Sequence, residues 1–130
     1  MQEINKNPRK GIKAILDLAA IKKEITINEL VFTIGPRINA AGRLETGRNA
    51  VKLLISDDHD DSKVNGANIN ITNIERRTID VNITAQALGM IEGDVKLINK
   101  KTTVLFCPDW HKGVVGIVAS RLTEKYYRPT

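Results

Sequence analysis

The feature that most constrains this chain is one long run of apolar residues at alternating spacings of three and four. Its members are Val64, Ala67, Ile71, Ile74, Thr78, Val81, Ala85 and Leu88. This spacing predicts one continuous helix from about Asp60 to Ile91, roughly 45 Å long at ~1.5 Å per residue. We expect this run to be the most buried face of the helix, because so narrow a stripe must lie along other helices or bridge two bodies. The same stripe also fits a coiled-coil dimer through the long helix, in which a second copy of the chain completes its burial.

Shorter helices are predicted before the long one. Apolar residues at helical spacing indicate a helix from about Arg9 to Ala20. Thr26 and Glu29 fit a capping box that opens a short helix, which we expect Gly35-Pro36 to end. Asn49 to Ile55 is predicted to be another short helix.

The chain changes character after Gly93-Asp94, which should break the long helix. Thr102 to Cys107 is rich in β-favouring apolar residues and predicts a buried strand. A loop should follow, and then a helix from Val114 to Tyr126. The fold class expected is therefore α/β and mostly helical. The partner strand that would complete a βαβ unit with this strand and helix is missing, which suggests an internal fragment of a longer protein.

The charge of the chain is uneven along its length. Residues 1–50 hold nine Lys/Arg against five Asp/Glu, residues 51–93 hold four against seven, and residues 94–130 hold seven against three. The basic balance permits binding to nucleic acid without specifying it. The single cysteine, Cys107, excludes an internal disulfide, and no run reaches the ~20 apolar residues of a membrane helix. We therefore expect a cytoplasmic protein.

The acidic cluster from Asp57 to Asp61 has two interpretations. Its carboxylates around His59 are of the type that ligates divalent ions. Acidic residues at the start of a helix also complement the macrodipole and cap free N–H groups. The second interpretation is favoured, because neighbouring carboxylates in one short stretch do not converge on a point without a looped scaffold. No metal site is expected in this chain.

Two further stretches combine small residues with basic ones. Arg37 to Arg43 encloses Asn39 and three small residues, which suits either close approach to a phosphate or a tight junction between helices. Trp110 to Gly116 lies where the predicted strand meets a helix, so that His111 either approaches an anion or packs the joint. No nucleophile, base and acid occur in a catalytic arrangement, and no catalytic residue is expected here.

With these stretches in view, the sequence resembles the RecJ branch of the DHH phosphoesterase superfamily. Three segments carry the resemblance, and they occur in the order that the family shows. They are Pro8-Arg9-Lys10-Gly11-Ile12-Lys13-Ala14-Ile15-Leu16, Gly35-Pro36-Arg37-Ile38-Asn39-Ala40-Ala41-Gly42-Arg43-Leu44, and the stretch from Trp110 to Leu122 that begins Trp110-His111-Lys112-Gly113-Val114-Val115-Gly116. The second and third segments are specific to this branch.

The resemblance implies a 5′-to-3′ exonuclease on single-stranded DNA that serves repair and recombination. Such an enzyme holds two divalent ions, Mn²⁺ or Mg²⁺, which activate water and stabilise the phosphate. The implied organisation is the edge of the catalytic domain in residues 1–59, a connector helix in 60–93 and the start of the DHH-associated domain in 94–130. The residues at motif positions that would bind DNA are Arg37, Asn39, Arg43 and His111. Arg37 and Arg43 would contact DNA phosphate or order the floor of the cleft, and His111 would lie at the edge of the second domain. The metal-binding Asp-His-His signature is absent, so that the parent protein rather than this chain is expected to be active.

Two alternatives to this function stay open at the level of sequence. One is a relative within the superfamily that cleaves short oligonucleotides or cyclic dinucleotides. The other is a non-catalytic helical module that binds nucleic acid or dimerises, which the basic blocks and the apolar stripe also favour.

Overall fold

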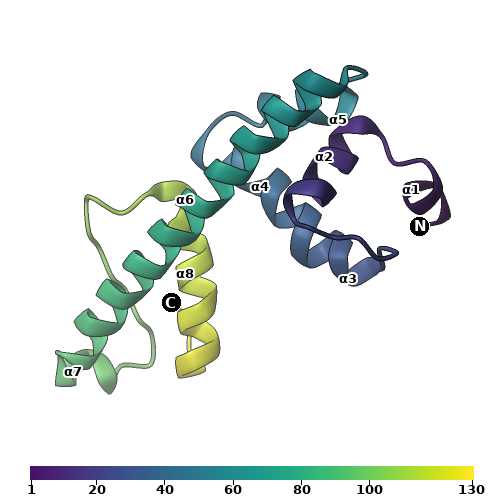
Figure 1. Ribbon diagram of the computed structural model, residues 1–130. Helices are drawn as coiled ribbons and strands as arrows, with labels where there is room; N and C mark the ends of the chain where they lie inside the picture. The colour runs from purple at the N-terminus through teal and green to yellow at the C-terminus, as the bar shows by residue number, and fades with distance from the viewer. The chain divides into compact units, whose positions relative to one another are not determined.

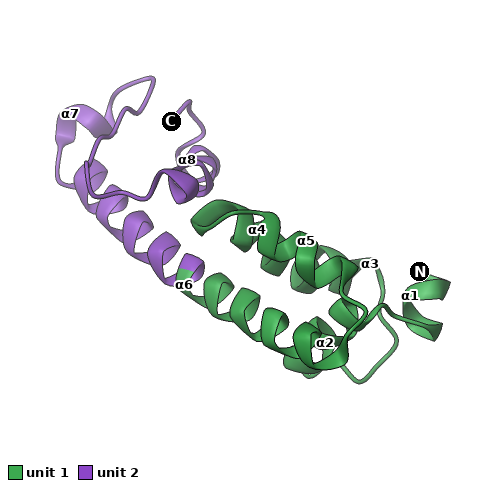
Figure 2. Cartoon of the chain, turned by 90° about the horizontal axis from the view of Figure 1, so that it is seen from above, with its two compact units in different colours: residues 1–75 green, residues 76–130 purple.

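The computed structural model describes residues 1–130, and its regular elements are all helices (Figure 1). They are α1 (Gln2–Lys6), α2 (Lys10–Leu18), α3 (Ile27–Glu29), the π-helix η1 (Leu30–Ile34), α4 (Gly35–Leu44), α5 (Arg48–Ile55), α6 (His59–Glu92), α7 (Val95–Ile98) and α8 (Lys112–Tyr126). The chain divides into two compact units, residues 1–75 and 76–130, and the division falls inside α6 (Figure 2). None of the helices combines the length and apolarity that crossing a lipid bilayer requires.

The first unit has a core that several short helices share. Its buried cluster consists of Ile15, Ile34, Ala41, Ala50, Leu53 and Ile69. The backbones of α2 and α5 come so close that a side-chain carbon on Gly11 would collide with the carbonyl oxygen of Leu53. Glycine at this position therefore allows the close packing of the two helices.

Residues 27–44 form consecutive helical segments, so the prediction that Gly35-Pro36 ends a helix is wrong. The capping box that opens the segment is confirmed, since the Thr26 hydroxyl accepts from the backbone N–H of Asn28 and Glu29 accepts from that of Thr26. A stretch of π-helix then precedes the proline, and the N–H of Gly35 donates to the carbonyl of Leu30, five residues back. The wider π-turn accommodates a proline whose ring and missing N–H disrupt ordinary α-helical bonding. Residues 37–43 therefore belong to a helix rather than to a junction.

The long helix is confirmed as one unbroken element, α6, but the prediction of its buried face is wrong. In the predicted stripe Val64, Ile71, Ile74 and Val81 are 55–63% exposed. The buried positions lie on a different face, at Ser62, Gly66, Ile69, Thr72, Asn73, Asp80, Ile83, Ala87 and Ile91. The two rows have similar helical spacing and differ in register by one to two residues, so periodicity predicts the helix without identifying its inner side.

In the second unit α8 lies beside the C-terminal half of α6 (Figure 1), and Val114, Val118 and Leu122 on α8 are buried. A charged contact fixes the pair, because the Arg121 guanidinium donates to both oxygens of the buried Asp80 carboxylate at 2.8 and 3.1 Å. Nη1 of Arg76 lies 3.6 Å from Oδ2 of the same carboxylate.

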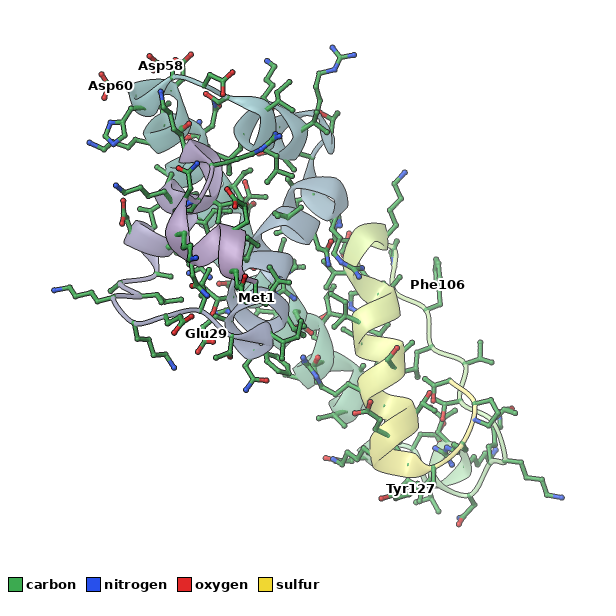
Figure 3. The ribbon with its side chains drawn as sticks, turned by 90° about the vertical axis from the view of Figure 1, so that its right-hand side faces the viewer. Met1, Glu29, Asp58, Asp60, Phe106 and Tyr127 are labelled. Atoms are coloured by element: carbon green, nitrogen blue, oxygen red, sulfur yellow. The ribbon has the colours of Figure 1, made fainter.

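The strand predicted for residues 102–107 is not formed, and this is a second correction. The backbone there has no ladder partner, although the Thr103 N–H donates to the carbonyl of Pro129. A strand exists only when a neighbouring strand accepts and donates its hydrogen bonds. Val104 and Phe106 are consequently 81% and 79% exposed, and Phe106 projects away from the ribbon (Figure 3).

The predictions for α2, α5 and α8 agree with the structure to within two residues at each end. The short helices α1 and α7 have no counterpart among the predictions. Helix α7 begins where the Asp94 side chain accepts from the N–H of Lys96.

Candidate nucleic-acid interface

Two of the four predicted contact residues lie together on α4. Asn39 and Arg43 are one helical turn apart, both are exposed, and both line an open groove of about 490 Å³. The remaining lining comes from α4 and from the start and inner side of α5, at Ile38, Gly42, Gly47, Ala50, Val51 and Leu54. A guanidinium and an amide therefore stand beside an apolar surface, an arrangement suited to a ligand with both charged and flat apolar parts.

Arg37, the third predicted residue, has different surroundings. Its Nε donates to Oδ1 of Asn70 on α6 at 3.0 Å, and its Nη1 donates to the carbonyl of Thr33 at 2.9 Å. Six positions separate it from Arg43, which places the two on different sides of one helix. The bond to Asn70 ties α4 to α6 and the bond to Thr33 ties α4 to η1, so the half-buried Arg37 has a structural role within the first unit.

His111, the fourth predicted residue, caps α8 in the second unit. Its Nδ1 accepts from the backbone N–H of Gly113 at 3.1 Å, so Nδ1 carries no proton and Nε2 is the remaining position for one. The indole of neighbouring Trp110 donates to Oε1 of Gln86 on α6 at 2.8 Å. These contacts support the packing role for this stretch, while a phosphate contact by His111 stays a prediction.

The acidic cluster functions as a helix cap. Oδ1 of Asp58 accepts from the N–H groups of Asp60 and Asp61, both at 2.8 Å. These bonds, that from Asp61 foremost, lower the pKa of the Asp58 carboxyl. No group of three or more His, Cys, Asp and Glu side chains in residues 1–130 is arranged to hold a metal ion.

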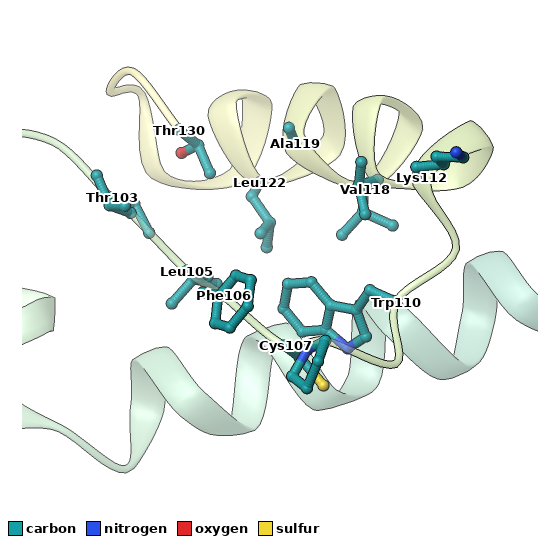
Figure 4. A pocket seen from close by; sticks show the side chains of 13 residues that line it. Thr103, Leu105, Phe106, Cys107, Trp110, Lys112, Val118, Ala119, Leu122 and Thr130 are labelled. Carbon is teal, nitrogen blue, oxygen red and sulfur yellow. The ribbon is translucent and has the colours of Figure 1, made fainter.

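A second cavity of about 490 Å³ lies between the extended stretch and α8 (Figure 4). Leu105, Trp110, Val118 and Leu122 contribute to its largely apolar wall, and Lys112 lies at one end. No predicted contact residue lines it.

Sequence reasoning missed the contribution of α5 to the groove. Gly47, Val51 and Leu54 recur at spacings of four and three, which is the signal that places them on one helical face. That face could not be placed against Asn39 and Arg43 from the sequence, because residues 37–43 were not predicted to be helical.

The comparisons with known proteins point to one group. No family model matches the sequence. The chain is 36% identical over 127 residues to the single-stranded-DNA-specific exonuclease RecJ of Salmonella typhimurium and to that of Escherichia coli, with 93% of the chain covered in each case. It is 33% identical over 130 residues to the RecJ of Bacillus subtilis. The chain spans 22% of the length of the first two relatives and 16% of the third.

Solved structures agree with the sequence matches. A crystal structure of RecJ in complex with Mg²⁺ from Thermus thermophilus superposes with a TM-score of 0.83 at 30% identity, covering 98% of this chain and 20% of that one. A crystal structure of exonuclease RecJ bound to manganese gives 0.84 at 31% identity, covering 98% and 31%. The fold of this chain is thus that of a region of RecJ exonucleases. The chain belongs to the RecJ family, and it corresponds to part of the length of its relatives.

Proposed function

We propose that the protein containing this chain is a RecJ-type hydrolase that degrades single-stranded DNA from the 5′ end during DNA repair and recombination in the cytoplasm. The observation that carries the proposal is the match of nearly the whole chain, in sequence and in fold, to exonucleases of that name. Cleavage of phosphodiester bonds and 5′-to-3′ polarity follow from the family resemblance.

Within such an enzyme this chain contributes to binding DNA rather than to hydrolysis. The metal-bound relatives support Mn²⁺ or Mg²⁺ as the cofactor of the whole enzyme. The side chains of this chain do not suit such ions, because its only dense acidic stretch serves as a helix cap. We therefore expect the isolated chain to release no nucleotides from single-stranded DNA in either ion. Chelator-sensitive release that persists through repurification contradicts this assignment.

The contacts to DNA are assigned to Arg37, Asn39, Arg43 and His111, with Arg43 as the main phosphate ligand. Its side chain lies on the exposed rim of the groove, and a guanidinium matches the geometry of phosphate oxygens. Arg37 acts mainly by holding α4 in place through its bonds to Asn70 and Thr33.

The substitution Arg43→Ala in the RecJ-type protein containing this chain tests the assignment. Loss of one charge-assisted contact of roughly 1.5–3 kcal/mol should weaken binding to single-stranded DNA about tenfold to a hundredfold. The slope of log affinity against log salt should fall by about 0.7. The matched control is Arg9→Ala, which removes an exposed arginine of the same unit away from the groove. A lower melting temperature with unchanged binding and slope assigns Arg43 to structure instead.

The extended stretch 102–107 is inferred to be a strand of an α/β DHH-associated domain when a partner strand is supplied. Its side chains alternate, with Thr103 buried, Val104 exposed, Leu105 half-buried and Phe106 exposed. Alternation of this kind is typical of a strand between two environments. Slow amide exchange at 104–107 in the longer protein, against fast exchange in this chain, is the expected result.

The exposed stripe of α6 supports association of two copies of this chain through that helix. Val64, Ile71, Ile74 and Val81 all lie at coiled-coil spacing and are more than half exposed. The solution mass of the chain tests this proposal, because Ile71→Lys should convert a dimer to a monomer. The proposal is overturned if this chain without the substitution is a monomer at high concentration.

A further inference from the structure

We propose that the groove between α4 and α5 receives one unstacked nucleobase of the single strand, next to the phosphate held by Arg43. The inference rests on the function proposed above and assigns the groove a ligand chemistry of its own. The groove volume of about 490 Å³ lies within the range of small-ligand sites, roughly 300–1,000 Å³.

The walls of the groove suit the flat, apolar face of a base. Ile38, Val51 and Leu54 supply aliphatic surface, and Val51 is 56% exposed in this chain. A side-chain carbon added to Gly42 or Gly47 would meet no atom within 4 Å, so both glycines border open space. Covering this surface with a base would remove apolar area from water, which favours binding.

Asn39 provides the polar group that a base edge requires. Its amide combines two donors with an acceptor, so it can pair with the edge of any of the four bases. It is exposed on the groove wall one turn before Arg43, on the same side of α4. This placement puts a base-reading group and a phosphate-binding group beside each other.

The local charge favours a nucleic acid over a basic peptide as the ligand of this groove. Residues 35–55 contain four basic side chains, Arg37, Arg43, Arg48 and Lys52, against one acidic side chain, Glu45. The Glu45 carboxylate is already engaged, because it accepts from Nδ2 of Asn49 at 2.7 Å and from the Thr72 hydroxyl at 3.2 Å. Arg48 and Lys52 are exposed one turn apart on α5, and although neither lines the groove, both add positive charge to the helix that forms one of its walls.

Filling the groove tests the inference without removing any charge. In Gly42→Leu a new side chain occupies open space, and the backbone there is compatible because no glycine has a positive φ. The matched control is Gly89→Leu, another helical glycine with nothing within 4 Å of the added carbon, located on α6. Each variant of the RecJ-type protein is titrated in EDTA with a fluorescent oligothymidylate and with an abasic strand of equal length.

We expect the unmodified protein to prefer the base-containing strand by about fivefold, the lower end of the effect of one stacked base. Gly42→Leu should abolish this preference while leaving the affinity for the abasic strand and the salt slope unchanged. Gly89→Leu should leave the preference, the affinity and the slope unchanged. Equal binding of the two strands by the unmodified protein overturns the inference, as does a Gly42→Leu variant that keeps the preference or loses affinity for both strands.

Failure of the groove and failure of the proposed function give different results. Suppose that Arg43→Ala lowers the affinity and the salt slope, but the unmodified protein binds the base-containing and abasic strands equally. The phosphate contact then stands and only the groove assignment is wrong. If no salt-dependent binding to either strand occurs, the proposed function is wrong and the groove inference with it.

Discussion

The two units of this chain differ in how completely each one buries its own apolar side chains and pairs its own backbone hydrogen-bonding groups. The first unit buries a shared cluster from α2, η1, α4, α5 and α6, including Ile15, Leu53 and Ile69. The second unit buries one side of α8 but leaves Val104 and Phe106 about four-fifths exposed. Helices complete their backbone hydrogen bonds internally, whereas an extended segment needs a neighbour. This chain is therefore well packed where its helices share a core and open along the extended stretch 102–107.

The largest expected effect comes from the core of the first unit. Leu53→Ala removes a fully buried side chain and should lower the free energy of unfolding by about 2–5 kcal/mol. The control Ile55→Ala, on the same helix but 63% exposed, should change it by no more than about 0.5 kcal/mol. Urea denaturation followed through amide signals of α2 and α5 gives both values. Equal losses in the two variants would contradict the idea of a closed core in this unit.

The second unit combines buried apolar side chains with one partly buried charged contact, whose contribution should be smaller than that of a core residue. Asp80 is 4% exposed, and Arg121 donates to both of its carboxylate oxygens. The Arg121 side chain is 48% exposed, so solvent screens the pair and we expect a coupling of only about 1–2 kcal/mol. A double-mutant cycle of Asp80→Ala and Arg121→Ala, followed by the fluorescence of the single tryptophan, Trp110, measures this coupling. Additive effects of the two substitutions would show that the contact between Asp80 and Arg121 does not help to hold α8 on α6.

The long helix shows how far sequence reasoning reaches and where it ends. The apolar spacing predicted α6 almost to its ends, because 3.6-residue periodicity is a property of the chain itself. It selected the wrong face, because the buried row contains polar residues that sequence reasoning places outside. Ser62 donates to the carbonyl of Asp58, Thr72 donates to that of Asn68, and Asp80 is paired with Arg121. Burial of such groups becomes favourable only once their partners are known.

The groove, like the long helix, could be predicted from the sequence only in part. Asn39 and Arg43 were identified from the motif that carries the family resemblance, and the structure places both on one side of α4. The helical state of this motif depends on η1, whose hydrogen bond from Gly35 to Leu30 accommodates Pro36. A glycine followed by a proline ordinarily indicates a helix end, and only the observed π-helical bond shows why it does not do so here.

The smallest expected effect is a local sensitivity of the first unit to acid, centred on the capping box. Hydrogen bonds from Lys23 and then from Thr26 lower the pKa of Glu29 from 4.5 to about 2. A carboxyl whose pKa is depressed by folding stabilises the folded state above its unfolded pKa of 4.5, and this contribution is lost as the pH falls toward about 2. An NMR titration of the Glu29 side-chain carbon should therefore show a midpoint near 2. Lys23→Met removes the largest cause, the contact of 2.7 Å between Nζ and Oε1, and should move the midpoint upward toward 4.5. A wild-type midpoint already close to 4.5 would show that neither the Lys23 contact nor the capping bonds from Thr26 favour the charged carboxylate of Glu29 in solution.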